Sequence, residues 1–171
     1  MPELDILGAN ATHVPIAAIV VRITIAGLLG ALIGFERELR NRPAGLRTHM
    51  LTAVAAAVFT VMTFEIYHEM VQLDAAIARL DPLRVIEAVR AGVAFLSAGA
   101  IIRSGGNIKG LTTGAAMWMA GAIGVACGSG FYGVAVVATV FVLIITALIG
   151  LFERRVSHSD EPVEANGSRD A

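Results

Sequence analysis

The chain has 171 residues, enough for one domain. Of these residues 56% are hydrophobic and the mean hydropathy is +0.74, whereas an ordinary soluble domain is about 45–50% apolar. The net charge of −1 excludes a general attraction to nucleic acid, and a single cysteine excludes an internal disulfide and a multi-cysteine metal site.

Five apolar runs are long enough to cross a membrane, because a helix that crosses about 30 Å of hydrocarbon needs roughly 20 apolar residues. A soluble bundle of buried helices is the alternative, but five such runs leave too little polar surface for it. Thr48 is expected to cap the second helix and Asp81 the third. The sequence therefore predicts an all-α membrane protein, a bundle of five transmembrane helices over about 15–35, 49–67, 82–102, 111–127 and 131–152.

Lysine and arginine determine the predicted orientation. Nine of the 13 fall in three places, which are the 36–47 loop, Arg103 with Lys109, and the segment after the fifth span. Five spans put all three places on one side, and the positive-inside rule makes that side cytoplasmic. We therefore expect the N-terminus outside and the C-terminus inside. The expected parts are a short extracytoplasmic tail (1–14), a five-helix transmembrane domain (15–155) and a disordered, polar cytoplasmic tail (156–171).

The loop between the first two spans, within "FERELRNRPAGLRTHML" (35–51), is dense in arginine. Pro43 cannot continue the first helix, and Gly45 is expected to take a positive φ and turn the chain. One interpretation is an orientation signal that touches anionic lipid, worth about 1 kcal/mol per basic residue. The other is a docking surface for a protein partner, or a loop locked against its own bundle, because arginine offers a planar fork of donors. The residues of this expected inner-face site are Arg37, Arg40, Arg42, Pro43, Gly45, Arg47, Thr48 and His49.

Two stretches resemble the signature blocks of the MgtC/SapB family. They are "GALIGFERELRNRPAGLRTHML" and the later "DPLRVIEAVRAGVAFLSAGAIIRSGGNIKGLTTGAAMWMAGAIGVACGSGFYGVA", and the likeness covers about 15–155. The resemblance implies a five-helix domain in the bacterial inner membrane, linked to growth in low magnesium and to the survival of pathogens inside host cells. It also implies action on the F1Fo ATP synthase and not magnesium transport. Longer members continue into a soluble C-terminal domain, which we do not expect here.

Small side chains recur at every fourth position in the first and fourth spans. Such ridges let helix backbones approach closely in lipid. They serve either packing within one bundle or contact with a second copy or another partner. The two ridges consist of Ala26, Gly30 and Gly34, and of Ala116, Ala120, Gly124 and Gly128.

Arg22, Glu87 and Arg90 are charged residues that fall within predicted spans. Arg22 and Glu87 lie at similar depth, and an unpaired charge in a membrane is costly. We therefore expect an Arg22–Glu87 ion pair, with Arg90 as a second partner for Glu87. The pair serves as a structural clamp, with snorkelling to the head groups as the alternative.

Glu87 is also the one candidate for a magnesium ligand, since Mg²⁺ often takes one or two carboxylates. Glu65, Glu69 and Asp81 lie near the same end of the bundle, but nearby arginines would repel a cation. His68 is expected to be a solvated loop residue.

The start of the fourth span holds Lys109, Gly110, Thr112 and Thr113. Glycines and hydroxyls at a helix N-terminus suit an anion, but the order of a P-loop is missing. The preferred interpretation is a tight turn with a threonine cap. Further along this span, Trp118 is expected to pack, and Cys127 is expected to be an inert small residue.

The sequence shows neither a nucleophile–base pair nor a cluster of metal ligands, so neither an enzyme nor a cofactor is expected. Three functions stay open, namely a regulator that binds another membrane complex, a transporter of Mg²⁺ or another cation, and a structural helper. The family resemblance favours the regulator. The expected partners are the lipid bilayer, a complex such as the F1Fo ATP synthase, and a second copy of the chain.

Overall fold

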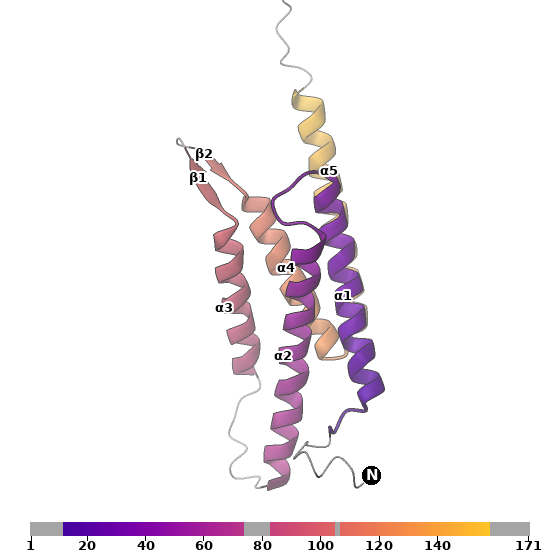
Figure 1. The fold of residues 1–171 in the computed structure, drawn as a ribbon. Helices are drawn as coiled ribbons and strands as arrows, with labels where there is room; N and C mark the ends of the chain where they lie inside the picture. The colour runs from indigo at the N-terminus through magenta and orange to yellow at the C-terminus, as the bar shows by residue number, and fades with distance from the viewer. Residues whose placement is uncertain (1–11, 74–82, 105–106, 158–171) are drawn as a thin grey trace, which may run out of the picture.

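The computed structural model describes residues 12–73, 83–104 and 107–157. Five helices and one two-stranded sheet make up this part (Figure 1). The predicted tails fall mostly outside the described residues, although the fifth helix continues beyond the predicted domain boundary, to Ser157. The elements are α1 (Ile16–Leu39), α2 (Leu46–Leu73), α3 (Leu83–Gly99), β1 (Ile102–Ser104), β2 (Asn107–Lys109), α4 (Leu111–Gly128) and α5 (Tyr132–Ser157).

Three of these helices are long and apolar enough to cross a membrane, namely Ile16–Leu39, Leu46–Gln72 and Leu111–Gly128. The stretch Tyr132–Leu148 of α5 is apolar but shorter, and α3 has 17 residues. The first two helices run well past the predicted spans, because their charged ends stay helical. The five predicted helices are therefore present, with three of them clearly of membrane-spanning length.

The basic segments gather at one end of the bundle. Figure 1 places the α1–α2 loop, the β1–β2 hairpin and the C-terminal end of α5 together at the top of the view, which we call the arginine-loop end. This arrangement is the one that an odd number of crossings requires. The sidedness itself, with the N-terminus outside and the C-terminus inside, stays a prediction.

The β1–β2 hairpin differs from the tight turn that we expected. Its strands are antiparallel and pair Ile102 with Lys109, Arg103 with Ile108, and Ser104 with Asn107. In the sequence two glycines stand between the strands, a pair typical of two-residue hairpin loops. The hairpin delivers the chain from α3 into the start of α4.

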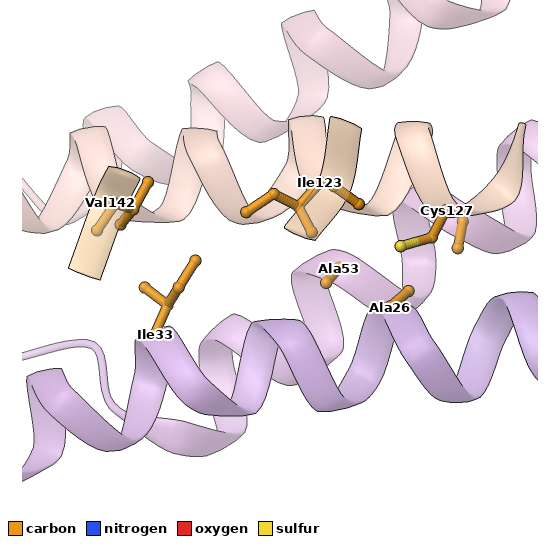
Figure 2. Packing of buried hydrophobic residues seen from close by; sticks show 9 residues of the cluster. Ala26, Ile33, Ala53, Ile123, Cys127 and Val142 are labelled. Carbon is orange, nitrogen blue, oxygen red and sulfur yellow. The ribbon is translucent and has the colours of Figure 1, made fainter. Parts of the chain in front are cut away.

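Helix α4 packs against each of the other four helices. The core consists largely of small side chains, and Figure 2 shows Ala26, Ala53, Ile123 and Cys127 meeting between the helices. Cys127 is fully buried, as expected for a small packing residue. Small core residues allow short distances between helices, which is typical of helix contacts in membranes.

Both small-residue ridges face α2. A Cβ added to Gly30 would lie 2.7 Å from the carbonyl oxygen of His49, and one added to Gly34 would lie 2.7 Å from Cα of Leu46. On the α4 ridge, a Cβ on Gly128 would lie 2.6 Å from the carbonyl oxygen of Ala57. These glycines bring backbone against backbone, so the structure uses both ridges for packing within the chain.

Candidate functional site

The candidate site is a polar cluster at the arginine-loop end, built by the last turn of α1 and the first turns of α2 and α4. Its centre is Arg37, which is only 3% exposed and lies on the buried side of α1. The Nη2 atom of Arg37 donates a hydrogen bond of 3.1 Å to Oγ1 of Thr113 in α4. Hydrogen bonds to a charged group are stronger than neutral ones, particularly where water is excluded. This bond joins the two signature segments, 76 residues apart in the sequence.

The expected cap of α2 is replaced by a residue from α1. Helix α2 begins at Leu46, so Thr48 lies inside the first turn and does not precede it. The carboxylate of Glu38 accepts a hydrogen bond of 2.8 Å from the backbone N–H of Leu46. A carboxylate at this position satisfies one of the helix's open donors and interacts favourably with the helix dipole.

Gly45 makes room for this carboxylate and does not turn the chain through a positive φ. A Cβ on Gly45 would lie 2.8 Å from Oε2 of Glu38. The residue with positive φ in this loop is Asn41, at 52°. Asparagine tolerates this left-handed conformation better than most residues. The turn thus comes four residues earlier than the sequence suggested.

The loop between α1 and α2 is held by its own backbone hydrogen bonds. The carbonyl of Arg37 accepts hydrogen bonds from the N–H groups of Arg40 and Arg42, at 3.2 and 3.1 Å, and the carbonyl of Glu38 accepts one from Asn41 at 3.0 Å. These bonds close the end of α1 in a compact turn just before Pro43. The side chains of Asn41, Arg42 and Pro43 are exposed on this turn. The result is a shaped surface with arginine on it.

His49 belongs to the buried part of the cluster and not to the exposed surface. It has no exposed area, and its Nδ1 lies 2.9 Å from the carbonyl oxygen of Gly45, one turn earlier in α2. Its Nε2 is buried and has no hydrogen-bond partner among the described residues. The charges of Arg37 and Glu36 lie close enough to act on the ring. The imidazole therefore anchors the first turn of α2 inside a charged environment.

Arg40 connects the cluster to α5. It forms an ion pair with Glu36, one turn earlier in α1. A Cβ on Gly150 of α5 would overlap the guanidinium of Arg40, so the arginine lies directly over that glycine. Of the predicted inner-face arginines, Arg37 and Arg40 therefore serve contacts within the bundle. Arg42 and Arg47 are exposed.

The start of α4 lacks the expected threonine cap. Its N-cap is Gly110, with φ of 90°, and no side chain forms a capping hydrogen bond there. A Cβ on Gly110 would overlap the carbonyl oxygen of Ala100, so glycine is required for both reasons. Lys109 and Thr112 are exposed, whereas Thr113 is buried and receives Arg37.

The predicted ion pair between Arg22 and Glu87 is absent. Nη1 of Arg22 donates a hydrogen bond of 2.9 Å to the carbonyl oxygen of Gly128, at the C-terminal end of α4. A cation at this position satisfies an open carbonyl and suits the helix dipole. Glu87 and Arg90 are instead exposed on α3. An unpaired carboxylate or guanidinium at the centre of a membrane helix costs about 2.5–3.5 kcal/mol on insertion scales.

The opposite end of the bundle carries one acidic residue, Glu65, whose carboxylate already has partners. The carboxylate of Glu65 accepts hydrogen bonds from the backbone N–H groups of His13 and Val14, at 2.6 and 2.9 Å. His68 lies in α2 and not in a loop, with its ring 5.4 Å from that of His13. Within the described residues no three histidine, cysteine, aspartate or glutamate side chains come together as a metal site. Glu87, the candidate magnesium ligand, lies apart on α3.

Sequence reasoning missed the role of Glu38 and the link between Arg40 and Gly150. Local capping rules do not point to Glu38, because it lies in α1, eight residues before the start of α2. Trp118 also differs from expectation, because it is 44% exposed.

Known proteins share this sequence over most of its length. The model of the MgtC family matches residues 23–155. "Protein MgtC" of Brucella abortus (strain 2308) is 43% identical over 135 residues, which are 79% of this chain and 52% of that protein. "Protein MgtC" of Salmonella typhimurium (strain LT2) is 36% identical over 150 residues, which are 88% and 59% of the two chains. An uncharacterized protein of Haemophilus influenzae is 37% identical over 141 residues, which are 82% and 59%.

The chain thus spans between 52% and 59% of the length of these relatives. No solved structure matches it. The matched region contains the whole polar cluster, including Arg37, His49 and Thr113. From the family model and the identities to these relatives, the chain belongs to the MgtC family.

Proposed function

We propose that this chain is a multi-pass protein of the bacterial inner membrane that regulates another membrane protein complex. The surface at the α1–α2 loop is the docking site, and Arg42 and Arg47 are its main contacts. Its role is in adaptation to low magnesium, and the F1Fo ATP synthase, implied by the family resemblance, is the first partner to test.

The observation that supports this proposal is the way in which the loop is fixed. A signal for orientation needs only positive charge at the correct side of the membrane. Here the loop is also held by backbone hydrogen bonds, by the cap from Glu38 and by the buried Arg37–Thr113 bond. A fixed loop loses little conformational freedom on binding, which raises affinity for a partner.

A cation transporter is the alternative, and the packing of the core supports it less well. A conduit needs polar groups that line a wet path. The contacts of α2 with α1 and α4 instead consist of small apolar side chains and of glycines pressed against backbone, such as Gly30 and Gly124. Mg²⁺ flux into liposomes that contain the purified protein tests this alternative directly.

The decisive experiment replaces Arg42 and Arg47 with lysine. Lysine keeps the charge but loses the bidentate fork of donors. We expect unchanged insertion and abundance, but loss of function, measured as growth in low magnesium and as proton-coupled ATP hydrolysis in membrane vesicles. The matched control replaces Arg154 and Arg155 with lysine, which changes the same residue type in another basic segment and should leave function intact.

Full function of the Arg42→Lys, Arg47→Lys variant would contradict docking through this loop. Loss of the variant from the membrane would show that these arginines hold the fold, and the docking proposal would lose its support. Mg²⁺ flux in liposomes would favour the transporter.

A further inference from the structure

Helix α3 carries an unusual set of exposed charges. Arg84, Glu87 and Arg90 all lie within its 17 residues, and all three are exposed. None of them forms an ion pair with another residue in the described part of the chain. In a membrane helix, charged side chains normally pair or face a wet cavity.

Two of these charges, Glu87 and Arg90, lie about one and two helical turns from the start of α3. The groove between α2 and α3 is lined by Val85, Ala88 and Phe59. This part of α2 lies against the C-terminal end of α4, since a Cβ on Gly128 would meet Ala57 and Thr60. Arg90 lines a cavity of about 210 Å³ with Trp118, which is near the midpoint of α4. Val93 packs against Gly121 of α4, so Arg90 lies about one turn nearer to the C-terminal end of α4 and Glu87 about two turns nearer.

The same side of α3 continues with small side chains, and the exposed Phe95 lies next to them. Ala91, Ala94 and Ala98 follow Glu87 at spacings of four, three and four residues, so they lie in one line along the helix. All three alanines are exposed. Small side chains in such a line allow another helix to approach closely. We call this line, with Glu87 and Arg90, the α3 face.

The charges on the α3 face indicate which kind of molecule binds it. The face carries one negative and one positive side chain, three residues apart, which is about 4.5 Å along the helix axis. Two copies inserted with the same orientation are related by an axis perpendicular to the membrane, and their α3 helices then run parallel. In a two-fold interface, residue i of one copy contacts residue j of the other, and the reverse contact follows. Glu87 of each copy then reaches Arg90 of the other, and both charges are paired.

The other small-residue surfaces are not available for contact with a second copy. The ridges that contain Gly30 and Gly124 are already covered by α2. Only α4 and, to a lesser extent, α2 contact α3 extensively among the described elements.

We propose that the α3 face is the surface on which two copies of this chain associate, through paired Glu87–Arg90 contacts and the alanine line. This self-association goes beyond the proposed docking function and uses a different part of the molecule.

Cysteine cross-linking in membranes tests the interface without disturbing its charges. The single native cysteine is first replaced (Cys127→Ala), and Ala94→Cys or Ala98→Cys is then introduced. The matched control is Val137→Cys, at an exposed apolar position of α5. We expect oxidation to give a disulfide-linked dimer from the α3 variants and none from the control.

Charge reversal tests the pairing. In the Ala94→Cys background, Glu87→Arg alone or Arg90→Glu alone should reduce the dimer fraction roughly 3- to 30-fold, the range for polar contacts between membrane helices. The double reversal restores both pairs and should return the dimer fraction to within about twofold of its starting value. Abundance in the membrane, measured for each variant, separates lost association from failed insertion.

Three results would overturn the proposal. The first is equal cross-linking at Val137, and the second is no restoration by the double reversal. The third is a cross-linked product at Ala94 with the mass of a different protein, or no product at all, which would mean that another protein or lipid covers the α3 face. None of these results bears on function of the α1–α2 loop, so this proposal and the docking proposal fail separately.

Discussion

The hydrogen bond between Arg37 and Thr113 can be removed with little change in shape. Thr113→Val keeps the volume and the branched form of the side chain and deletes only the hydroxyl. Arg37 is 3% exposed and the bond is 3.1 Å long, so water cannot easily replace the lost acceptor. A hydrogen bond to a charged group contributes about 1.5–3 kcal/mol, and we expect the free energy of unfolding to fall by that amount.

Unfolding in detergent micelles measures this change. For a chain of this size, about 1 kcal/mol shifts the midpoint by roughly 2–4 °C, so Thr113→Val should lower it by about 3–12 °C. Thr113→Ser is the matched control, because it keeps the hydroxyl and loses one buried methyl group. Deletion of a buried methyl costs about 0.5–1.5 kcal/mol, so serine should be the milder change.

A double-mutant cycle decides whether loss of the Arg37–Thr113 hydrogen bond causes the fall in the free energy of unfolding. In an Arg37→Leu background the hydroxyl has lost its charged donor, and Thr113→Val should then have almost no effect. Groups in contact couple by about 0.5–3 kcal/mol. Equal effects of Thr113→Val in the two backgrounds would refute the view that this bond joins α1 to α4.

Four further predictions concern other contacts. Glu38→Ala should lower the free energy of unfolding by about 0.5–2 kcal/mol through loss of the α2 cap, and Glu38→Gln, which keeps one oxygen acceptor, should lose less in the same unfolding assay. Gly124→Ala should be strongly destabilising, since its Cβ would overlap a carbonyl of α2, whereas Gly92→Ala, with nothing within 4 Å, should be neutral or gain up to about 1 kcal/mol. Arg22→Gln and Glu87→Gln should have effects that add within about 0.3–0.5 kcal/mol, and a larger deviation would show that the two side chains do interact. Reporter fusions should place the N-terminus outside and the C-terminus inside, and a shared side would exclude an odd number of crossings.

The sequence was sufficient for the number of helices, because membrane thickness sets the length of each apolar run. It was less reliable at their ends. Helix α1 continues to Leu39 because its charged last turn still forms helical hydrogen bonds, and hydropathy does not detect these. The cap of α2 was assigned to Thr48 by local rules, whereas the actual acceptor, Glu38, belongs to the preceding helix.

The charged residues show why contacts were harder to infer than elements. Arg22 was expected to pair with Glu87, since an opposite charge is the partner that a sequence reveals. Its acceptor is the backbone carbonyl of Gly128, 106 residues away. Every residue has a carbonyl, so no side chain in the sequence marks this one. The same holds for Gly150, which matters only because Arg40 lies over it.

The contact partner of each glycine in α4 determines which second mutation can rescue its loss. A Cβ on Gly121 would lie 2.9 Å from a methyl group of Val93, so trimming that valine to alanine could make room for it. At Gly124 the obstacle is the carbonyl oxygen of Ala53, which every amino acid carries. Suppressors of Gly121→Ala should therefore arise at Val93, and among homologues these two positions should covary in size. Gly124 should have no compensating substitution on α2. It should remain glycine even in homologues whose neighbouring residues differ widely from those of this chain.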